Sequence, residues 1–133
     1  MNEQRYTVGV VQAAPAYLDL AASVDKAVHL IAQAAQAGAR LLAFPELWLP
    51  GYPWWIWLDG EERAALHQRY REQAFTHGST AAQTIAQAAA AHGIHVAMGM
   101  AERKGSQLYI AQWLVDAQGA TRLRRRKVKA GPV

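Results

Sequence analysis

A strand–helix–strand pattern in the first third of the sequence most narrows the folds that this chain can adopt. Residues 7–12 form a β-branched run that Pro15 closes, which predicts a short buried strand. Apolar residues then recur at spacings of three and four through residues 24–35, which predicts a helix with Asp19 as its N-cap. Residues 40–44 form a second apolar strand. Because a helix connects the two strands, we expect them to be parallel neighbours.

The middle of the chain predicts a long aromatic loop followed by two helices. Prolines and a glycine between residues 47 and 60 exclude a regular element there. Residues 61–75 begin with acidic side chains, which favour the start of a helix. Ser79 or Thr80 is placed to cap another helix, which runs to His92.

The final part of the chain predicts three more strands, at residues 94–100, 108–115 and 121–129. Only tight turns separate them, so we expect these three strands to be antiparallel. The whole pattern is that of an α/β fold with a mixed sheet, and no linker is long enough to divide it into domains.

Composition excludes several classes of site and of location. The sequence has no cysteine, which rules out disulfides and thiolate metal sites. The five histidines are interpreted as structural or surface residues, so no metal site is expected. No apolar run reaches about 18 residues, and the polar residues 1–6 do not resemble a secretory signal. We therefore expect a cytoplasmic protein without a membrane partner.

The formal net charge of +4 comes from one short segment. Six basic residues crowd positions 122–129, and the rest of the sequence is slightly acidic. Alternation along a strand would divide these side chains between two faces and dilute any single basic patch. A nucleic-acid partner is therefore not expected.

Glu46 is the first candidate catalytic residue. It follows an apolar strand and Pro45, and it precedes a loop rich in indole rings. The carboxyl ends of strands are where open α/β sheets usually bind ligands. A carboxylate under an aromatic cover there would be partly desolvated and suited to proton transfer. From the residues alone, a glutamate that pairs with an arginine or caps a helix remains an alternative.

Lys127 is the second candidate. In the last strand, Arg125 and Lys127 share one face, whereas Arg124 and Arg126 share the other. Neither face is cleanly apolar, which a strand tolerates when one of its sides lines a polar site. From the residues alone, an edge strand protected by charge against aggregation is the favoured explanation of the same pattern.

The tryptophans of the aromatic loop are the third candidate. Trp54, Trp55 and Trp57 are costly to expose to water. They could pack beneath the loop, line a pocket for an apolar substrate, or form a partner surface. The sequence does not separate these three explanations.

Four segments carry a resemblance to a known family. Residues 42–53, LAFPELWLPGYP, resemble the first signature of the nitrilase branch of the carbon–nitrogen hydrolases, and residues 124–129, RRRKVK, resemble the strand that bears the catalytic lysine of that family. Residues 8–15 and 98–103 are similar to the first strand of the family and to the end of its third. The resemblance covers about residues 6–129, and these motifs are highly specific in combination and order.

The resemblance implies a fold and a set of catalytic roles. The family has an α-β-β-α sandwich of two stacked sheets, and this chain would be its N-terminal half, a mixed sheet with helices on one face. The family uses a Glu-Lys-Cys triad, in which Glu46 would be the general base and Lys127 would stabilise the tetrahedral intermediate. The residues that would line or cover the substrate pocket are Tyr52, Pro53, Trp54 and Trp57. No metal or organic cofactor is implied.

The missing cysteine is the main departure from the family pattern. The family's nucleophile lies on a later strand, and this sequence contains no cysteine. We therefore interpret residues 1–133 as a partial carbon–nitrogen hydrolase domain, truncated before the nucleophile strand and inactive alone. A non-catalytic assembly or partner-binding fragment of the same scaffold is the alternative. The expected partners are a nitrile or amide substrate and either further copies of the chain or a complementary C-terminal half.

Two spatial predictions follow from the resemblance. The Glu46 carboxylate and the Lys127 ammonium should meet within one buried cleft. A half-sandwich should also expose an apolar sheet face that the second sheet would otherwise cover.

Overall fold

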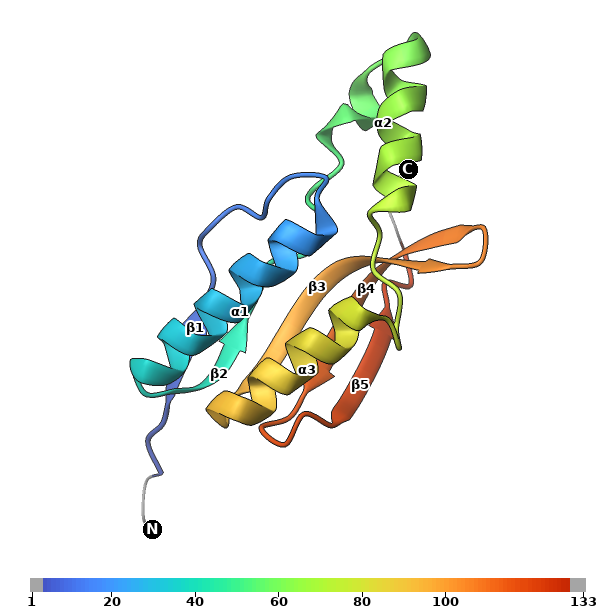
Figure 1. The fold of residues 1–133 in the computed structure, drawn as a ribbon. Helices are drawn as coiled ribbons and strands as arrows, with labels where there is room; N and C mark the ends of the chain where they lie inside the picture. The colour runs from blue at the N-terminus through green and yellow to red at the C-terminus, as the bar shows by residue number, and fades with distance from the viewer. Residues whose placement is uncertain (1–3, 130–133) are drawn as a thin grey trace.

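Five strands form one mixed sheet in the computed structural model, which describes residues 4–129 (Figure 1). Their order in the sheet follows the sequence: β1 (Thr7–Val10), β2 (Ala39–Ala43), β3 (His95–Lys104), β4 (Gln107–Val115) and β5 (Thr121–Arg126). β1, β2 and β3 are parallel, whereas β4 and β5 continue the sheet as antiparallel strands. Both pairing predictions are therefore confirmed.

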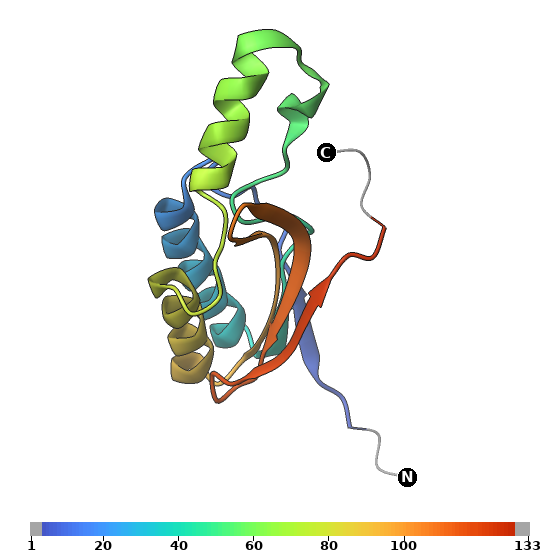
Figure 2. The same cartoon turned by 90° about the vertical axis from the view of Figure 1, so that its right-hand side faces the viewer.

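The two long helices of the core cover only one face of this sheet. Figure 2 shows α1 (Leu20–Gln36) and α3 (Thr80–His92) side by side against one side of the strands. The third helix, α2 (Gly60–Glu72), projects beyond the end of the sheet together with the 3₁₀ turn η1 (Trp54–Trp57). We call the two sides of the sheet the helix-covered face and the open face. The predicted α/β class, mixed sheet and one-sided helices are confirmed.

Local sequence signals explain where the two core helices begin and end. The Asp19 carboxylate accepts a hydrogen bond from the Ala22 N–H at 3.0 Å, and the Ser79 hydroxyl accepts one from the Ala82 N–H at 3.3 Å. Both are side-chain caps that satisfy a free donor in the first turn. At the end of α3, Gly93 takes a left-handed conformation with φ of 61°, which a glycine adopts without strain.

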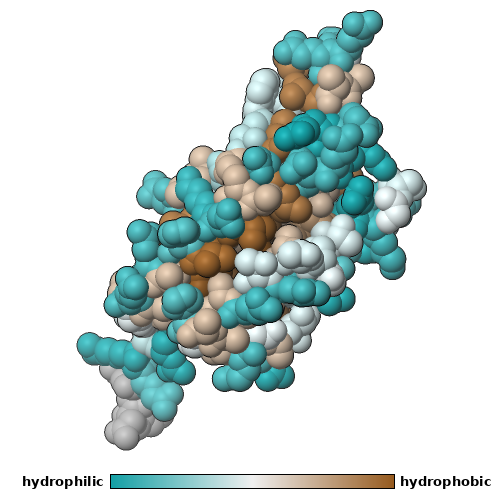
Figure 3. All heavy atoms as spheres, in the orientation of Figure 1, coloured by the Kyte–Doolittle hydropathy of each residue, from teal (hydrophilic) through white to brown (hydrophobic). Residues whose placement is uncertain are grey.

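The main hydrophobic core lies between the helices and the helix-covered face. Ile31 from α1 and Ile85 from α3 are fully buried, and they pack in the same cluster as alternate β3 residues: Val96, Met98 and Met100. Period-2 alternation places these three β3 side chains on one face. Seen from the helix side, apolar atoms gather in a strip through the middle with hydrophilic residues on both flanks (Figure 3).

Three predictions about individual elements were wrong. β1 is not a buried strand, because Val8 and Val10 are 53% and 79% exposed. The aromatic loop does contain a regular element, the 3₁₀ turn η1, because Pro53 stands at its N-cap, where a missing N–H interrupts no helical hydrogen bond. β5 ends at Arg126 rather than at Lys129.

The open face carries the exposed apolar side chains that a half-sandwich should show. Val8 and Val10 lie on it, because the intervening Gly9 directs its hydrogen toward Leu42 and α1 on the other face. Leu123 of β5 is 48% exposed and shares this face with Lys127.

None of the helices within residues 4–129 has the length and apolar character that crossing a membrane requires.

Candidate active site

Glu46 lies three residues after the end of β2, where the chain crosses over β3 on the open face. The crossing is unusually close: a Cβ atom on Gly99 would lie 2.1 Å from the Pro45 carbonyl oxygen and 3.0 Å from the Glu46 Cα. Only glycine leaves room for this approach. Gly99 therefore determines how near the Glu46 backbone can come to the sheet.

The loop that follows Glu46 is fixed to β3 by backbone hydrogen bonds. The Leu49 N–H donates to the Gly99 carbonyl at 3.2 Å, and the Leu49 carbonyl accepts from the Ala101 N–H at 2.8 Å. The Trp48 indole N–H donates to a carbonyl oxygen in the loop after β1 at 2.8 Å. Glu46 is thus placed by β2 on one side and by β3 on the other.

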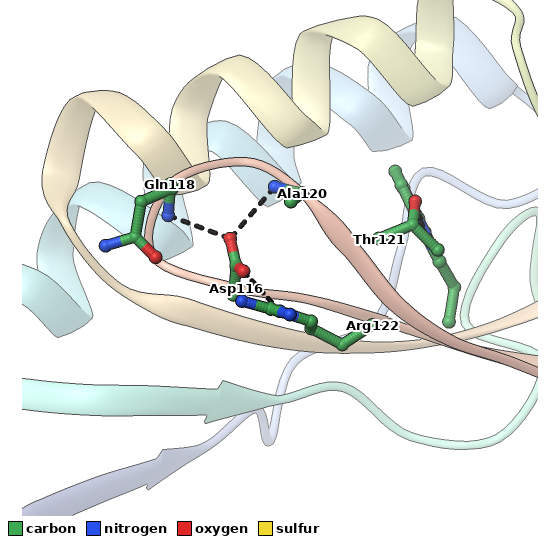
Figure 4. A network of polar contacts seen from close by, with 6 residues as sticks. Asp116, Gln118, Ala120, Thr121 and Arg122 are labelled. Carbon is green, nitrogen blue, oxygen red and sulfur yellow. Dashed lines mark hydrogen bonds and ion pairs between the residues drawn. The ribbon is translucent and has the colours of Figure 1, made fainter.

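The hairpin turn before β5 is organised by one carboxylate. Asp116 accepts hydrogen bonds from the Gln118 and Ala120 N–H groups, both at 2.9 Å, and from Arg122 Nε at 2.6 Å (Figure 4). The Ala120 N–H and the Arg122 guanidinium hold the pKa of the Asp116 carboxyl below its usual range. The turn therefore sets the register in which β5 pairs with β4.

Lys127 is the first residue after β5. Its N–H donates to the Ile110 carbonyl at 2.8 Å, which extends the β4–β5 ladder one residue beyond Arg126. Its Nζ donates to Glu46 Oε1 at 2.9 Å, across 81 residues of sequence. The prediction that these two side chains meet is confirmed.

The surroundings of this pair differ from the buried cleft that we predicted. The Lys127 and Glu46 side chains are 44% and 48% exposed. They line a shallow pocket of about 180 Å³ whose other walls are Ile110, Ala111, Gln112 and Arg125. The pair is open to water because the described residues place no second layer on the open face.

A second ion pair lies on the other side of the sheet, one residue before Lys127. Arg126 donates to both oxygens of Glu102, with Nε at 3.0 Å and Nη2 at 2.7 Å. These hydrogen bonds hold the pKa of the Glu102 carboxyl below its usual value. Neither residue was predicted from the sequence to have a role. Alternation places both side chains on the helix-covered side of their strands, but no local pattern in the sequence pairs them.

The aromatic loop is divided between a buried and an exposed part. Trp55 is buried against Tyr70 of α2. Of the three roles that the sequence allowed for these tryptophans, packing beneath the loop therefore holds for Trp55. Tyr52, Trp54 and Trp57 are exposed. Pro53 is buried between them, and none of the four predicted substrate-binding residues lines the Glu46–Lys127 pocket. Their assignment to substrate stays a prediction.

Comparison with known proteins gives the family. A family model described as carbon-nitrogen hydrolase matches residues 7–132. The chain belongs to this family. The resemblance in residues 42–53 and 124–129 is thereby confirmed.

Several curated relatives of this carbon–nitrogen hydrolase chain are named as nitrilases. A nitrilase of Pseudomonas syringae pv. syringae is 50% identical over 124 residues, and a bromoxynil-specific nitrilase of Klebsiella pneumoniae subsp. ozaenae is 44% identical over 125 residues. An arylacetonitrilase of Aspergillus niger is 46% identical over 122 residues. The alignments cover 92–93% of this chain, but the chain spans only 36–37% of the length of these relatives.

The fold is shared with solved structures of the superfamily. An amidase from Nesterenkonia sp. superimposes with a TM-score of 0.70 at 23% identity, over 99% of this chain and 46% of the amidase chain. The sheet and helices of this carbon–nitrogen hydrolase chain therefore match the N-terminal half of the nitrilase fold. Among the residues that the structure describes, no group of three histidine, aspartate or glutamate side chains could hold a metal ion.

Proposed function

We propose that this chain is the N-terminal part of a nitrilase-type hydrolase and supplies two of its three catalytic groups, Glu46 and Lys127. The observation that carries the proposal is their 2.9 Å contact, formed by two segments that the family resemblance had marked separately. Both side chains reach a pocket on the open face, where a further layer of the protein could supply the cysteine and close the site.

The chemistry needs a carboxylate and an ammonium at this separation. A cysteine thiolate from outside these residues attacks the nitrile carbon and forms a C–S bond, and electron density moves to the nitrogen. The Lys127 ammonium stabilises that charge, while Glu46 accepts the thiol proton and later takes a proton from the attacking water. Proton transfer to nitrogen gives a thioimidate, and the first water, deprotonated by Glu46, adds to its carbon. The tetrahedral intermediate then breaks its C–N bond, releases ammonia and leaves a thioester, which a second water hydrolyses to the carboxylic acid and the free thiol.

A nitrile is the proposed substrate class, because the curated relatives named above are all nitrilases. The same residues would suit an amide, whose leaving group is also ammonia. The exposed rings of Tyr52, Trp54 and Trp57 and the buried Pro53 would approach substrate only when further parts of the protein complete the pocket. In this proposal the isolated chain is inactive, and its protein partners are further copies of the chain in a homo-oligomer or a complementary C-terminal half.

A chimeric enzyme tests the proposal. Residues 7–127 replace the matching segment of the Pseudomonas syringae nitrilase, and ammonia release from a nitrile is measured. We expect an active chimera, whose kcat falls at least about 10²–10³-fold on Glu46→Gln or Lys127→Met. The matched controls Glu61→Gln and Lys26→Met change exposed residues of the same types and should retain activity. Activity that survives Glu46→Gln would overturn the proposal.

The isolated chain provides the complementary arm. No ammonia should be released by the 133-residue protein, with or without the substitutions. Hydrolysis by the isolated chain would refute a cysteine-dependent role. An inactive chimera that still folds and assembles would favour the alternative, a non-catalytic assembly fragment of the same scaffold.

A further inference from the structure

We propose that Arg126 is a positioning residue: its ion pair with Glu102, braced by the Tyr109 ring, holds the Lys127 ammonium against Glu46. The inference rests on the proposed function for the importance of that contact. It concerns a residue that does not touch the pocket chemistry itself, and it can be tested without any catalytic activity.

The Arg126 side chain is held more firmly than any other basic side chain of β5 that the structure describes. Its guanidinium binds both oxygens of the Glu102 carboxylate, in the two-pronged geometry that only arginine provides. Its Cζ also lies 3.8 Å from the centre of the Tyr109 ring, a cation–π contact. The Glu102 side chain is only 11% exposed, so water competes weakly for it.

This ion pair spans two strands. Arg126 belongs to β5 and Glu102 to β3, while Ala111 of β4, the sheet partner of Arg126, lies between them. β5 is the last strand of the described sheet and has backbone hydrogen bonds on one side only. The side-chain link therefore ties the free edge of the sheet to its interior strand on the helix-covered face.

β3 is also the strand that places Glu46. Gly99 admits the Pro45–Glu46 backbone, and Leu49 bonds to the β3 backbone on both sides of Met100. Glu102 lies three residues beyond Gly99 in the same strand. One rigid strand thus serves as the common reference for both partners of the Glu46–Lys127 contact.

The link acts through the backbone. Arg126 and Lys127 are adjacent in sequence, so in an extended chain their side chains point to opposite faces of the sheet. Anchoring the Arg126 side chain therefore fixes the direction in which the Lys127 side chain leaves the backbone. Beyond Arg126, the described β4–β5 ladder has only one more hydrogen bond, from the Lys127 N–H to the Ile110 carbonyl. Without the anchor, an edge-strand terminus is free to fray.

The hairpin at the other end of β5 provides a matched control. Arg122 pairs with Asp116 at 2.6 Å, but its side chain is 67% exposed, and it lies five residues from Lys127. Both arginines belong to the same strand and both pair with a carboxylate that is largely buried. Only the pair beside Lys127 should affect the Glu46 contact.

The test measures the reactivity of Lys127 in the intact chain by competitive acylation and mass spectrometry, with exposed Lys26 as the internal reference. An ion-paired ammonium acylates more slowly than a free one. Removing the Glu46 carboxylate with Glu46→Gln should raise the relative rate about two- to fivefold, as expected for a half-exposed pair. Arg126→Ala should raise the acylation rate of Lys127 to a similar level. Arg126→Lys should give a rate between those of Arg126→Ala and the unmodified chain, and Arg122→Ala should leave the rate unchanged.

Amide hydrogen exchange is measured on the same samples to separate positioning from unfolding. We expect residues 111–115 and 121–125 to remain protected in Arg126→Ala. If that variant loses protection throughout β5, Glu102→Gln is used instead, since it keeps the shape of the carboxyl group and weakens the link.

The outcomes are distinguishable. A raised rate in Glu46→Gln with an unchanged rate in Arg126→Ala, or in Glu102→Gln where that variant is used, overturns the positioning role and leaves the proposed function intact. An equal rise in Arg122→Ala also overturns it. An unchanged rate in Glu46→Gln contradicts the contact itself, and with it the basis of both proposals.

Discussion

The two faces of the sheet differ in how completely this chain finishes them. On the helix-covered face, Ile31 and Val96 are fully buried by packing between α1, α3 and β3. On the open face, Val10 is 79% exposed and the Glu46–Lys127 pair is open to water. The helix-covered face is therefore fully packed, whereas the open face carries exposed side chains that a further layer of the protein would cover. Stability should depend on the first face and catalysis on the second.

The largest expected difference is in the free energy of unfolding. Ile31→Ala removes a buried side chain and leaves a cavity, so it should cost about 2–5 kcal/mol. Val10→Ala on the open face should change stability by less than about 0.5 kcal/mol. Denaturation of the two variants in urea measures both values. Equal losses would show that the open face is packed in solution and would break the comparison.

Gly99→Ala should give the next largest effect and should act on the open face. The added methyl would lie 2.1 Å from the Pro45 carbonyl oxygen, which is backbone and cannot rotate away. We expect a loss of about 1–3 kcal/mol from overpacking and a displaced Glu46.

The matched control is Gly9→Ala, whose added methyl meets the flexible end of Leu42 on the helix-covered face. It should cost less in the same urea denaturation, and the competitive acylation of Lys127 should change only in Gly99→Ala. Unaltered Lys127 reactivity in Gly99→Ala would mean that the close crossing does not place Glu46.

The pH dependence of stability should report the link between β3 and β5. The pKa of Glu102 is lowered from its ordinary 4.5, chiefly by the hydrogen bonds from Arg126. A lowered folded-state pKa stabilises the folded chain fully above pH 4.5, and this contribution is lost as the pH falls through the lowered value.

Glu102→Gln should therefore cost about 1 kcal/mol at neutral pH and flatten the acid limb of the unfolding curve. Thermal unfolding between pH 3 and 7 measures this, with exposed Glu61→Gln as the control. An acid limb of the same steepness in Glu102→Gln would exclude the ion pair as its source.

Self-association should be the mildest consequence of the open face. Val8, Val10 and Leu123 present apolar surface there, so the chain should associate at high concentration. Val10→Lys should shift the sedimentation profile toward monomer, whereas Gln33→Lys on the exposed side of α1 should not. A sharp monomer peak for the unmodified chain would count against an uncovered face.

The parts of the fold that local signals control were predictable from the sequence. The Asp19 and Ser79 caps and the apolar spacing of α1 placed the helices correctly. The burial of β1 was not predictable, because the pattern of residues 7–12 is that of a strand covered on both faces and carries no information about whether the second cover is present.

The site was predictable only in part. The contact between Glu46 and Lys127 came from the family motifs, since neither residue pattern alone chose between a catalytic and a surface role. Gly99 in the middle of a strand is a signal of close backbone approach, which the structure places at the Pro45–Glu46 crossing. The Glu102–Arg126 link depends on the register of three strands, which no local pattern specifies.

The most direct test of the account is a double-mutant cycle on the chimeric enzyme, with kcat/KM measured for Glu46→Gln, Lys127→Met and the two combined. Residues that act as one catalytic unit lose about as much together as either loses alone. We predict that the double variant is no more than about tenfold worse than the poorer single variant. Losses that multiply fully would show that the two side chains act independently, and would contradict a shared catalytic site on the open face.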